Sequence, residues 1–258
     1  IAPYRDVLNI FVRPVDGDEA RPVTSFTDRP VSGFSWAWNS EQLLFGRDTA
    51  GDENTHLFAA NINGSPPVDL TPIDGVKAMV VESERDRPDE VVIGLNDRDP
   101  RHHDYYILNT RTGDRTPLLM NEEGYLGYLF TSDWTPRGRL SMTPEGGLKA
   151  EMKDDQGWYE FMNIGMEDSM TTQPLGFGAD DRFLYGLDSR GRDTAALVVL
   201  PAERGGGARP DILFSSDRAD VTGTLTSPLT KKPEAVLIEY LRPEWTALDP
   251  AVEGDLKA

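Results

Sequence analysis

The sequence predicts an all-β protein in which a four-stranded antiparallel sheet recurs along the chain. Short apolar runs rich in aromatic and β-branched residues alternate with turns of Gly, Asn, Asp and Pro, which is typical of strands in a meander. The clearest stretch, residues 31–71, contains four such runs, at 31–38, 42–47, 56–62 and 67–70. Asn63-Gly64, between the last two runs, is the strongest turn signal because both residues accept positive φ in a type I′ turn.

The same pattern returns with a period in the forties. Copies of the second run end 48, 48 and 44 residues apart, at Gly46, Gly94, Met142 and Gly186. Copies of the third run with its turn end 47 and 49 residues apart, at Gly17, Gly64 and Gly113. A period of this length with four strands per unit is the signature of a β-propeller blade. Helical solenoids have similar periods, but these runs are too short and too β-branched for helices.

The repeat divides the chain, residues 1–258, into blade-like units of one propeller domain. We expect complete units at 31–74, 76–121, 125–173 and 174–215, and partial units at 1–28 and 221–258. The first unit is expected to hold only its third and fourth strands. A seven-bladed ring with about 45 residues per blade needs roughly 315 residues. We therefore expect an incomplete array, with about four full blades plus partial ones out of seven.

Three segments interrupt the strand pattern. Residues 96–104 are expected to form a polar connection between the second and third strands of their unit. The glycines at 205–207 are expected to form a flexible hairpin tip, and residues 245–258 to begin a helical or irregular excursion. Before Trp245 we expect negligible helix. Trp36 and Trp38 alternate along one run, so we expect both to share a face and fill a core between blades.

Composition limits the possible functions. The formal charge of −18 and the pI near 4.5 argue against nucleic acid or an anionic membrane as the natural partner. The absence of cysteine excludes disulfides, thiol catalysis and cysteine-ligated zinc. No apolar stretch approaches the ~18–20 residues of a membrane span. Because the chain begins at Ile1 rather than Met, a missing upstream segment is one expectation, and the compartment, cytoplasmic or periplasmic, stays open.

One turn offers candidate substrate contacts. Asp52, Glu53 and Asn54 follow Gly51, and their carboxylates could face the amine of a substrate. The alternative, which we favour, is a turn in which these side chains bond to the backbone and cap the strand ends.

A second polar cluster could hold a metal. Asp97, Asp99, His102, His103 and Asp104 supply enough donors. The segment lacks the Gly and distal Glu of a calcium loop and the i,i+4 histidines of a zinc helix. We therefore expect a solvated loop here, and no bound metal or cofactor in the chain.

Three stretches are more specific than the blade repeat. They are R-P-V-S-G-F-S-W-A-W-N-S-E-Q-L-L-F-G-R-D-T-A-G-D-E-N-T-H-L-F at 29–58, D-R-P-D-E-V-V-I-G-L-N-D-R-D-P-R-H-H-D at 86–104 and L-R-P-E-W-T-A-L-D-P at 241–250. They resemble the propeller of bacterial peptidases of the prolyl oligopeptidase family, in its acylaminoacyl-peptidase and dipeptidyl-peptidase-like branch. In that family an N-terminal propeller caps a C-terminal α/β-hydrolase domain and restricts which peptides reach the active site. The resemblance implies that role here, with peptide substrates and the hydrolase domain of the same parent protein as partners.

The catalytic motif of that family is missing from this chain. An α/β-hydrolase nucleophile lies in Gly-x-Ser-x-Gly, and no such pentapeptide occurs. His56, His102 and His103 are the only candidates for a histidine base, and none has a Ser partner in a strand–turn–helix context. We expect this chain alone to be inactive, although the parent protein would be a serine peptidase. The alternative is a stand-alone TolB-like propeller that acts as a protein-interaction scaffold.

An incomplete array is predicted either to dimerise through its open ends or to close into a smaller, distorted ring. Each blade buries its apolar faces only against its neighbours, so an open end leaves several hundred Å² of apolar surface exposed. At about 25 cal/mol per Å², covering such a face is worth on the order of 10 kcal/mol. The charge of −18 opposes association, but salt screens it, so dimerisation should strengthen as salt is raised. Light scattering over a series of protein and salt concentrations measures this, and a chain that stays monomeric with no dye-accessible apolar surface would contradict it.

Overall fold

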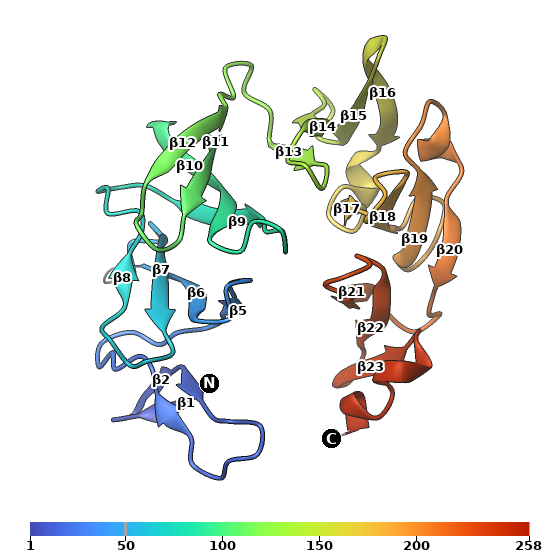
Figure 1. Ribbon diagram of the computed structural model, residues 1–258. Helices are drawn as coiled ribbons and strands as arrows, with labels where there is room; N and C mark the ends of the chain where they lie inside the picture. The colour runs from blue at the N-terminus through green and yellow to red at the C-terminus, as the bar shows by residue number, and fades with distance from the viewer. Residues whose placement is uncertain (49–50, 258) are drawn as a thin grey trace. The chain divides into compact units, whose positions relative to one another are not determined.

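The computed structural model describes residues 1–48 and 51–257, and it is all-β (Figure 1). Within these residues 23 strands form seven separate antiparallel sheets, of which four have four strands, one has three and two have two. Helix is limited there to four single-turn 3₁₀ segments, at Met166–Asp168, Gly206–Ala208, Pro250–Val252 and Asp255–Lys257. None of these helices has the length and hydropathy of a membrane span. The chain divides into two compact units, Ile1–Gly124 and Tyr125–Ala258.

The first unit contains four sheets. Two short ribbons come first, β1 with β2 and β3 with β4, at Ala2–Tyr4, Val7–Asn9, Phe11–Val12 and Arg21–Pro22. The next sheet has the order β5-β6-β7-β8, at Ser35–Trp36, Gln42–Arg47, His56–Asn61 and Val68–Asp69. The last has the order β9-β10-β11-β12, at Ala78–Glu82, Glu90–Asp99, His102–Asn109 and Arg115–Leu119.

The second unit contains three sheets. The first is the meander β13-β14-β15-β16, at Gly127–Phe130, Pro136–Met142, Leu148–Asp154 and Gly157–Ile164. The second is β17-β18-β19-β20, at Gln173–Phe177, Phe183–Asp188, Ala196–Pro201 and Asp211–Phe214. The third has three strands, β21-β22-β23, at Val221–Thr226, Pro233–Glu239 and Pro243–Ala247.

This architecture confirms the predicted fold class. In each of the five larger sheets, strands adjacent in sequence pair in simple up-and-down order, as in a propeller blade. The protein is therefore an all-β propeller of small antiparallel sheets, with five blade sheets in the described residues. The unit predicted at 125–173 contains β15 and β16, which carry Met152 and Met162.

The cores lie between consecutive sheets, and strand alternation explains how. In β6, Leu43 and Phe45 join a cluster with Ile10 and Val23 of the preceding ribbon. Leu44, between them, points to the opposite face and joins a cluster with residues of β10 and β11. Successive side chains of a strand alternate between faces, so β6 is buried on both sides. β19 repeats the arrangement, because Leu197 belongs to one cluster while Ala196, Val198 and Leu200 belong to another.

Five local expectations differ from the structure. Trp36, which was expected in a core, is 53% exposed, whereas the adjacent Ala37 is buried. Residues 245–247 belong to strand β23, where Trp245 pairs with Leu237, and only the residues after them form 3₁₀ turns. Residues 1–9, expected to hold no strand of their own, form the β1–β2 hairpin. Its turn residues Arg5 and Asp6 both have positive φ, at 50° and 67°, without a glycine to mark them in the sequence.

The other two corrections concern polar and glycine-rich segments. Most of residues 96–104 is not a loop, because β10 and β11 extend through it and Asp99 pairs with His102. Gly206 and Gly207 are buried rather than a flexible tip. A Cβ at Gly207 would lie 1.9 Å from the carbonyl oxygen of Phe161, so only glycine permits this close approach.

Neighbouring sheets of the first unit are also joined by a buried polar contact. The Gln42 side chain donates to the backbone oxygen of Thr110 at 2.9 Å and accepts from the Thr110 hydroxyl at 2.8 Å. Asn39, in the turn before β6, donates to Asp89 of the next sheet at 2.9 Å. These bonds fix the β5–β8 sheet against the β9–β12 sheet.

The Gln42→Ala variant should be less stable by about 1–3 kcal/mol, because it leaves the buried Thr110 groups without their partner. Urea unfolding of the variant and the wild type measures this difference. Gln156→Ala, on an exposed turn, is the matched control and should change stability by less than about 0.5 kcal/mol. Equal losses in the two variants would show that the Gln42 contact does not stabilise the unit.

Candidate functional site

The candidate turn at residues 51–54 has a defined geometry. Asp52 accepts hydrogen bonds from the backbone nitrogen of Asn54 at 3.1 Å and from its side-chain amide at 3.2 Å. Glu53 has a φ of 61°, and both it and Asp52 are exposed. The side-chain to backbone bond is the turn geometry that the sequence favoured, and the two acidic side chains still face solvent.

A groove in the first unit lies beside this turn. Its polar half is a cavity of about 460 Å³, lined by Arg29, Ser32, Arg47, Asp48 and Thr55 among others. Its apolar half is a cavity of about 280 Å³, lined chiefly by Phe34, Leu44, Leu57, Met79 and Val80. Gly33 and Gly46 line both halves, so the two cavities adjoin. We call them together the β5–β9 groove, because its apolar half lies between the first strands of two consecutive sheets.

Each arginine of the groove is held by an aspartate. Arg29 donates to Asp48 through Nε at 3.2 Å and Nη2 at 3.0 Å. Arg47 donates to Asp28, and its guanidinium lies 4.1 Å from the centroid of the Phe26 ring. The hydrogen bond from Arg47 holds the pKa of the Asp28 carboxyl below its usual range. The two arginines and their two aspartates therefore contribute no net charge to the polar half of the groove.

The second predicted cluster forms ion pairs within the β10–β11 hairpin. Asp104 is buried and accepts two bonds from Arg98, at 2.7 and 2.8 Å, and one from the backbone of Asn121. The bonds from Arg98 lower the pKa of Asp104. Asp99 pairs with Arg101, whose bonds hold the pKa of that carboxyl well below its usual range. The expected solvated loop is thus an ion-paired hairpin, and among the described residues no group of three or more acidic or histidine side chains could hold a metal ion.

The three histidines lie apart from any nucleophile motif. His56 Nδ1 lies 2.8 Å from Asp69, on the neighbouring strand β8. Nδ1 of His102 and Nε2 of His103 are buried, and within the described residues neither has a hydrogen-bond partner. Burial, followed by the nearby charge of Lys77, lowers the pKa of His103. The neutral imidazole is therefore the form that the fold favours.

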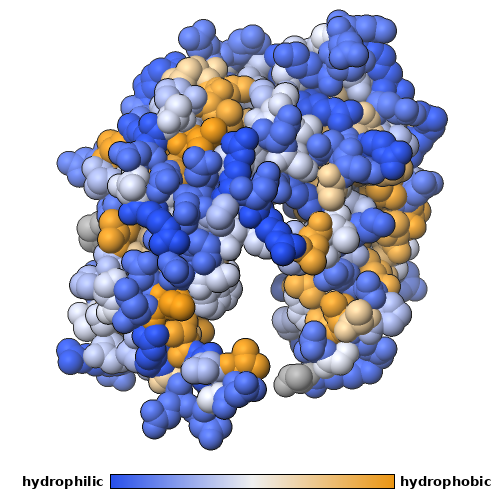
Figure 2. All heavy atoms as spheres, viewed as in Figure 1, coloured by the Kyte–Doolittle hydropathy of each residue, from blue (hydrophilic) through white to orange (hydrophobic). Residues whose placement is uncertain are grey.

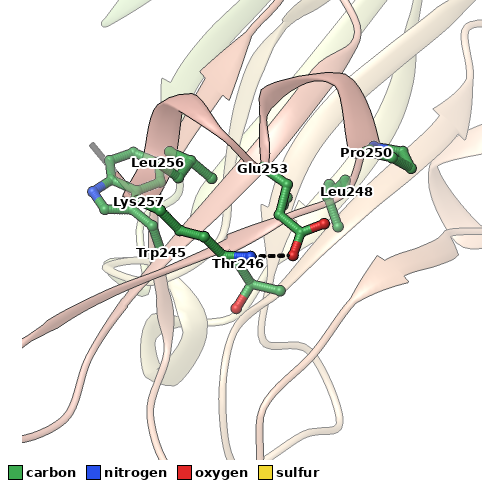
Figure 3. Close-up of a pocket in the computed structure, with 8 residues that line it drawn as sticks. Trp245, Thr246, Leu248, Pro250, Glu253, Leu256 and Lys257 are labelled. Atoms are coloured by element: carbon green, nitrogen blue, oxygen red, sulfur yellow. Dashed lines mark hydrogen bonds and ion pairs between the residues drawn. The ribbon is translucent and has the colours of Figure 1, made fainter.

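A further cavity, of about 430 Å³, lies at the end of the second unit (Figure 3). Trp245, Leu248, Pro250 and Leu256 supply its apolar lining, and Lys257 forms an ion pair with Glu253 at 2.6 Å. Figure 3 shows this pair beside Thr246, with the Trp245 ring next to Leu256 and Lys257. Glu253 and Lys257 neutralise each other, and we assign no chemistry to this cavity.

The surface agrees with the acidic composition. Figure 2 shows a largely hydrophilic face on which apolar side chains gather in separate groups, one of them over β20. Ile212 and Leu213 are the exposed apolar residues of that strand. The sequence gives no sign of the β5–β9 groove, because its exposed Phe34, Met79 and Val80 have the same residue types as core positions.

The relatives of this chain are peptidases. It is 37% identical over its whole length to dipeptidyl aminopeptidase BIII of Pseudoxanthomonas mexicana and 27% identical to dipeptidyl peptidase family member 6 of Caenorhabditis elegans. It spans only 37% and 36% of the length of these proteins. No family model matches the chain. The resemblance to peptidases predicted from three sequence stretches is thus confirmed.

Among solved structures, TolB of Acinetobacter baumannii aligns with a TM-score of 0.56 at 12% identity. The alignment covers 93% of this chain and 57% of TolB. At this identity the likeness shows the fold alone, so it agrees with the sheet architecture and adds nothing about function.

His103 predicts a dependence of stability on pH. Its folded pKa is below the unfolded value of about 6.5, so the stability it contributes is present above pH 6.5 and is lost as pH falls through the folded pKa. The aspartates with lowered pKa, such as Asp104, stay ionised in this range. Urea midpoints between pH 7.5 and 5 should therefore fall less in His103→Gln than in the wild type. An identical fall in the two proteins would contradict the prediction.

Proposed function

We propose that this chain is the substrate-gating propeller of a serine peptidase that acts on oligopeptides, of the dipeptidyl-peptidase or acylaminoacyl-peptidase type. The observation that carries the proposal is the 37% identity along the whole chain to a dipeptidyl aminopeptidase of which the chain spans 37%. A match confined to one part of a longer enzyme suits a domain that cooperates with a separate catalytic domain. Without Gly-x-Ser-x-Gly the chain has no nucleophile elbow, so it is inactive alone.

The partner in this proposal is an α/β-hydrolase domain of the same parent protein. The five blade sheets would be part of a seven-bladed array that covers the active site and admits short peptides. A stand-alone TolB-like scaffold is less favoured, because the likeness to TolB is one of fold at 12% identity.

Asp52, Glu53 and Asn54 are the proposed contacts of the substrate amine. Two exposed carboxylates lie on a turn whose backbone is fixed by the Asp52–Asn54 bonds. A protonated amine donates charge-assisted hydrogen bonds to such oxygens, and these bonds are stronger than neutral ones. The Glu53 carboxylate is exposed to solvent, and the hydrogen bonds from Asn54 hold the Asp52 carboxylate in position.

In the parent protein, Asp52→Asn combined with Glu53→Gln should lower kcat/KM at least tenfold for dipeptidyl substrates with a free amine. The same variant should leave hydrolysis of N-acetylated peptides within about twofold, because those lack the cation. A tenfold loss corresponds to about 1.4 kcal/mol, within the range of a hydrogen bond to a charged group. Steady-state kinetics on matched p-nitroanilide substrates measures both.

Glu145→Gln, on the exposed turn between β14 and β15, is the control and should leave both activities unchanged. The present chain alone should hydrolyse none of these substrates. Hydrolysis by the chain alone that a serine-directed reagent abolishes would refute the non-catalytic role. Equal losses on free and acetylated substrates would refute the amine contact.

A further inference from the structure

The β5–β9 groove has an unusual surface for so acidic a chain. Phe34, Met79 and Val80 are 41%, 45% and 39% exposed, and all three line its apolar half. Large apolar side chains that gather at one hollow, rather than being scattered singly, mark interaction sites. The two halves, of about 460 and 280 Å³, together have the size of ligand pockets.

The polar half offers donors without net charge. Arg29 and Arg47 are each neutralised by an aspartate, Asp48 and Asp28. Arg29 uses Nε and Nη2 on Asp48, and its Nη1 has no hydrogen-bond partner among residues 1–48 and 51–257. A phosphate or carboxylate would meet two balancing aspartates here and the exposed acids Asp52 and Glu53 nearby. A neutral acceptor, such as a peptide carbonyl, would meet a donor without that repulsion.

We propose that the β5–β9 groove binds an extended, uncharged peptide segment that carries one large aliphatic or aromatic side chain. That side chain enters between Phe34, Met79 and Val80, and a main-chain carbonyl of the segment accepts from Nη1 of Arg29. This site rests on the proposed function. It adds a preference for an apolar residue inside the substrate peptide to the preference for the free amine at the N-terminus of that peptide. The occupant is substrate peptide, and the balanced charge of the polar half is the reason for choosing an uncharged segment.

The groove can be filled without disturbing the fold. A Cβ at Gly33 would meet no atom within 4 Å, and the backbone there is outside the left-handed region. Gly33→Leu therefore places a side chain in the groove where both halves meet. Gly254 in the second unit is equally open and equally unstrained, so Gly254→Leu is a matched control.

The test uses the 258-residue chain and Gly-Ser-Leu-Ser-Gly that carries fluorescein on its N-terminal nitrogen, which removes the free amine, and an amide at its C-terminus. Fluorescence polarisation should show binding that is at least fivefold weaker when Ser replaces Leu in the peptide. Gly33→Leu should weaken binding of the Leu peptide at least tenfold, and Gly254→Leu should keep it within twofold. If Gly33→Leu fails to fold, Met79→Ser at an exposed position should give at least a fivefold loss instead.

Equal binding of the Leu and Ser peptides, or unchanged binding by Gly33→Leu, would overturn the proposal. Absence of binding by the wild-type chain would overturn it as well. Because the peptide has no free amine and is not cleaved, these outcomes are separate from the kinetic test of the proposed function. The parent enzyme could pass that test while this groove binds nothing.

Discussion

Burial of the β5–β8 and β17–β20 sheets on both faces is the constraint on which each unit depends. A strand of a two-layer protein has one buried and one solvated face, whereas Leu43, Leu44 and Phe45 in β6 are all buried. Their alternation sends adjacent side chains into different clusters, one with the preceding ribbon and one with the following sheet. No sheet therefore completes its core alone, and its stability includes that of its neighbours.

Polar contacts fix how neighbouring sheets within a unit are oriented, which apolar burial alone would not specify. In both units the turn between the first two strands of a sheet reaches the next sheet. Asn39 donates to Asp89 in the first unit, and Ser132 donates to Asp181 in the second. Arg137 adds a bond to the backbone of Ala202 at 2.7 Å. Hydrogen bonds are directional, so these turns select one arrangement among the many that nonspecific burial allows.

The same architecture explains where a binding surface can form. First strands such as β5 and β9 are short and have no partner on one side, so side chains next to them stay exposed. In the first unit this exposure includes Phe34 and Met79 beside two neutralised arginines. A surface of that kind suits the main chain and apolar side chains of a peptide. It does not suit nucleic acid, which the charge of −18 also disfavours.

The sequence alone was sufficient for the fold class. A period in the forties and runs of four to eight residues separated by turns determine local pairing, because strands adjacent in the sequence pair with each other. The type I′ turn expected at Asn63-Gly64 does not form, since of these two residues only Gly64 has a positive φ, at 86°. β6 and β7 were accordingly predicted close to their observed bounds. The acidic turn at Asp52 was also predicted, because the Asx geometry depends only on residues two apart in the chain.

Other features depend on contacts between residues that are distant in the sequence, and only the tertiary structure determines these features. Residues 96–104 look like a loop by composition, but Arg98 and Asp104 neutralise each other across the hairpin, and this allows strands to extend through polar residues. Trp36 looks like a core residue, but the position of its strand at a sheet edge leaves it exposed, while the neighbouring Ala37 is buried. The β5–β9 groove joins residues from Arg29 to Val80, and only the packing of two sheets brings them together. Burial is a property of the assembled sheets, and for that reason a single strand's composition cannot specify it.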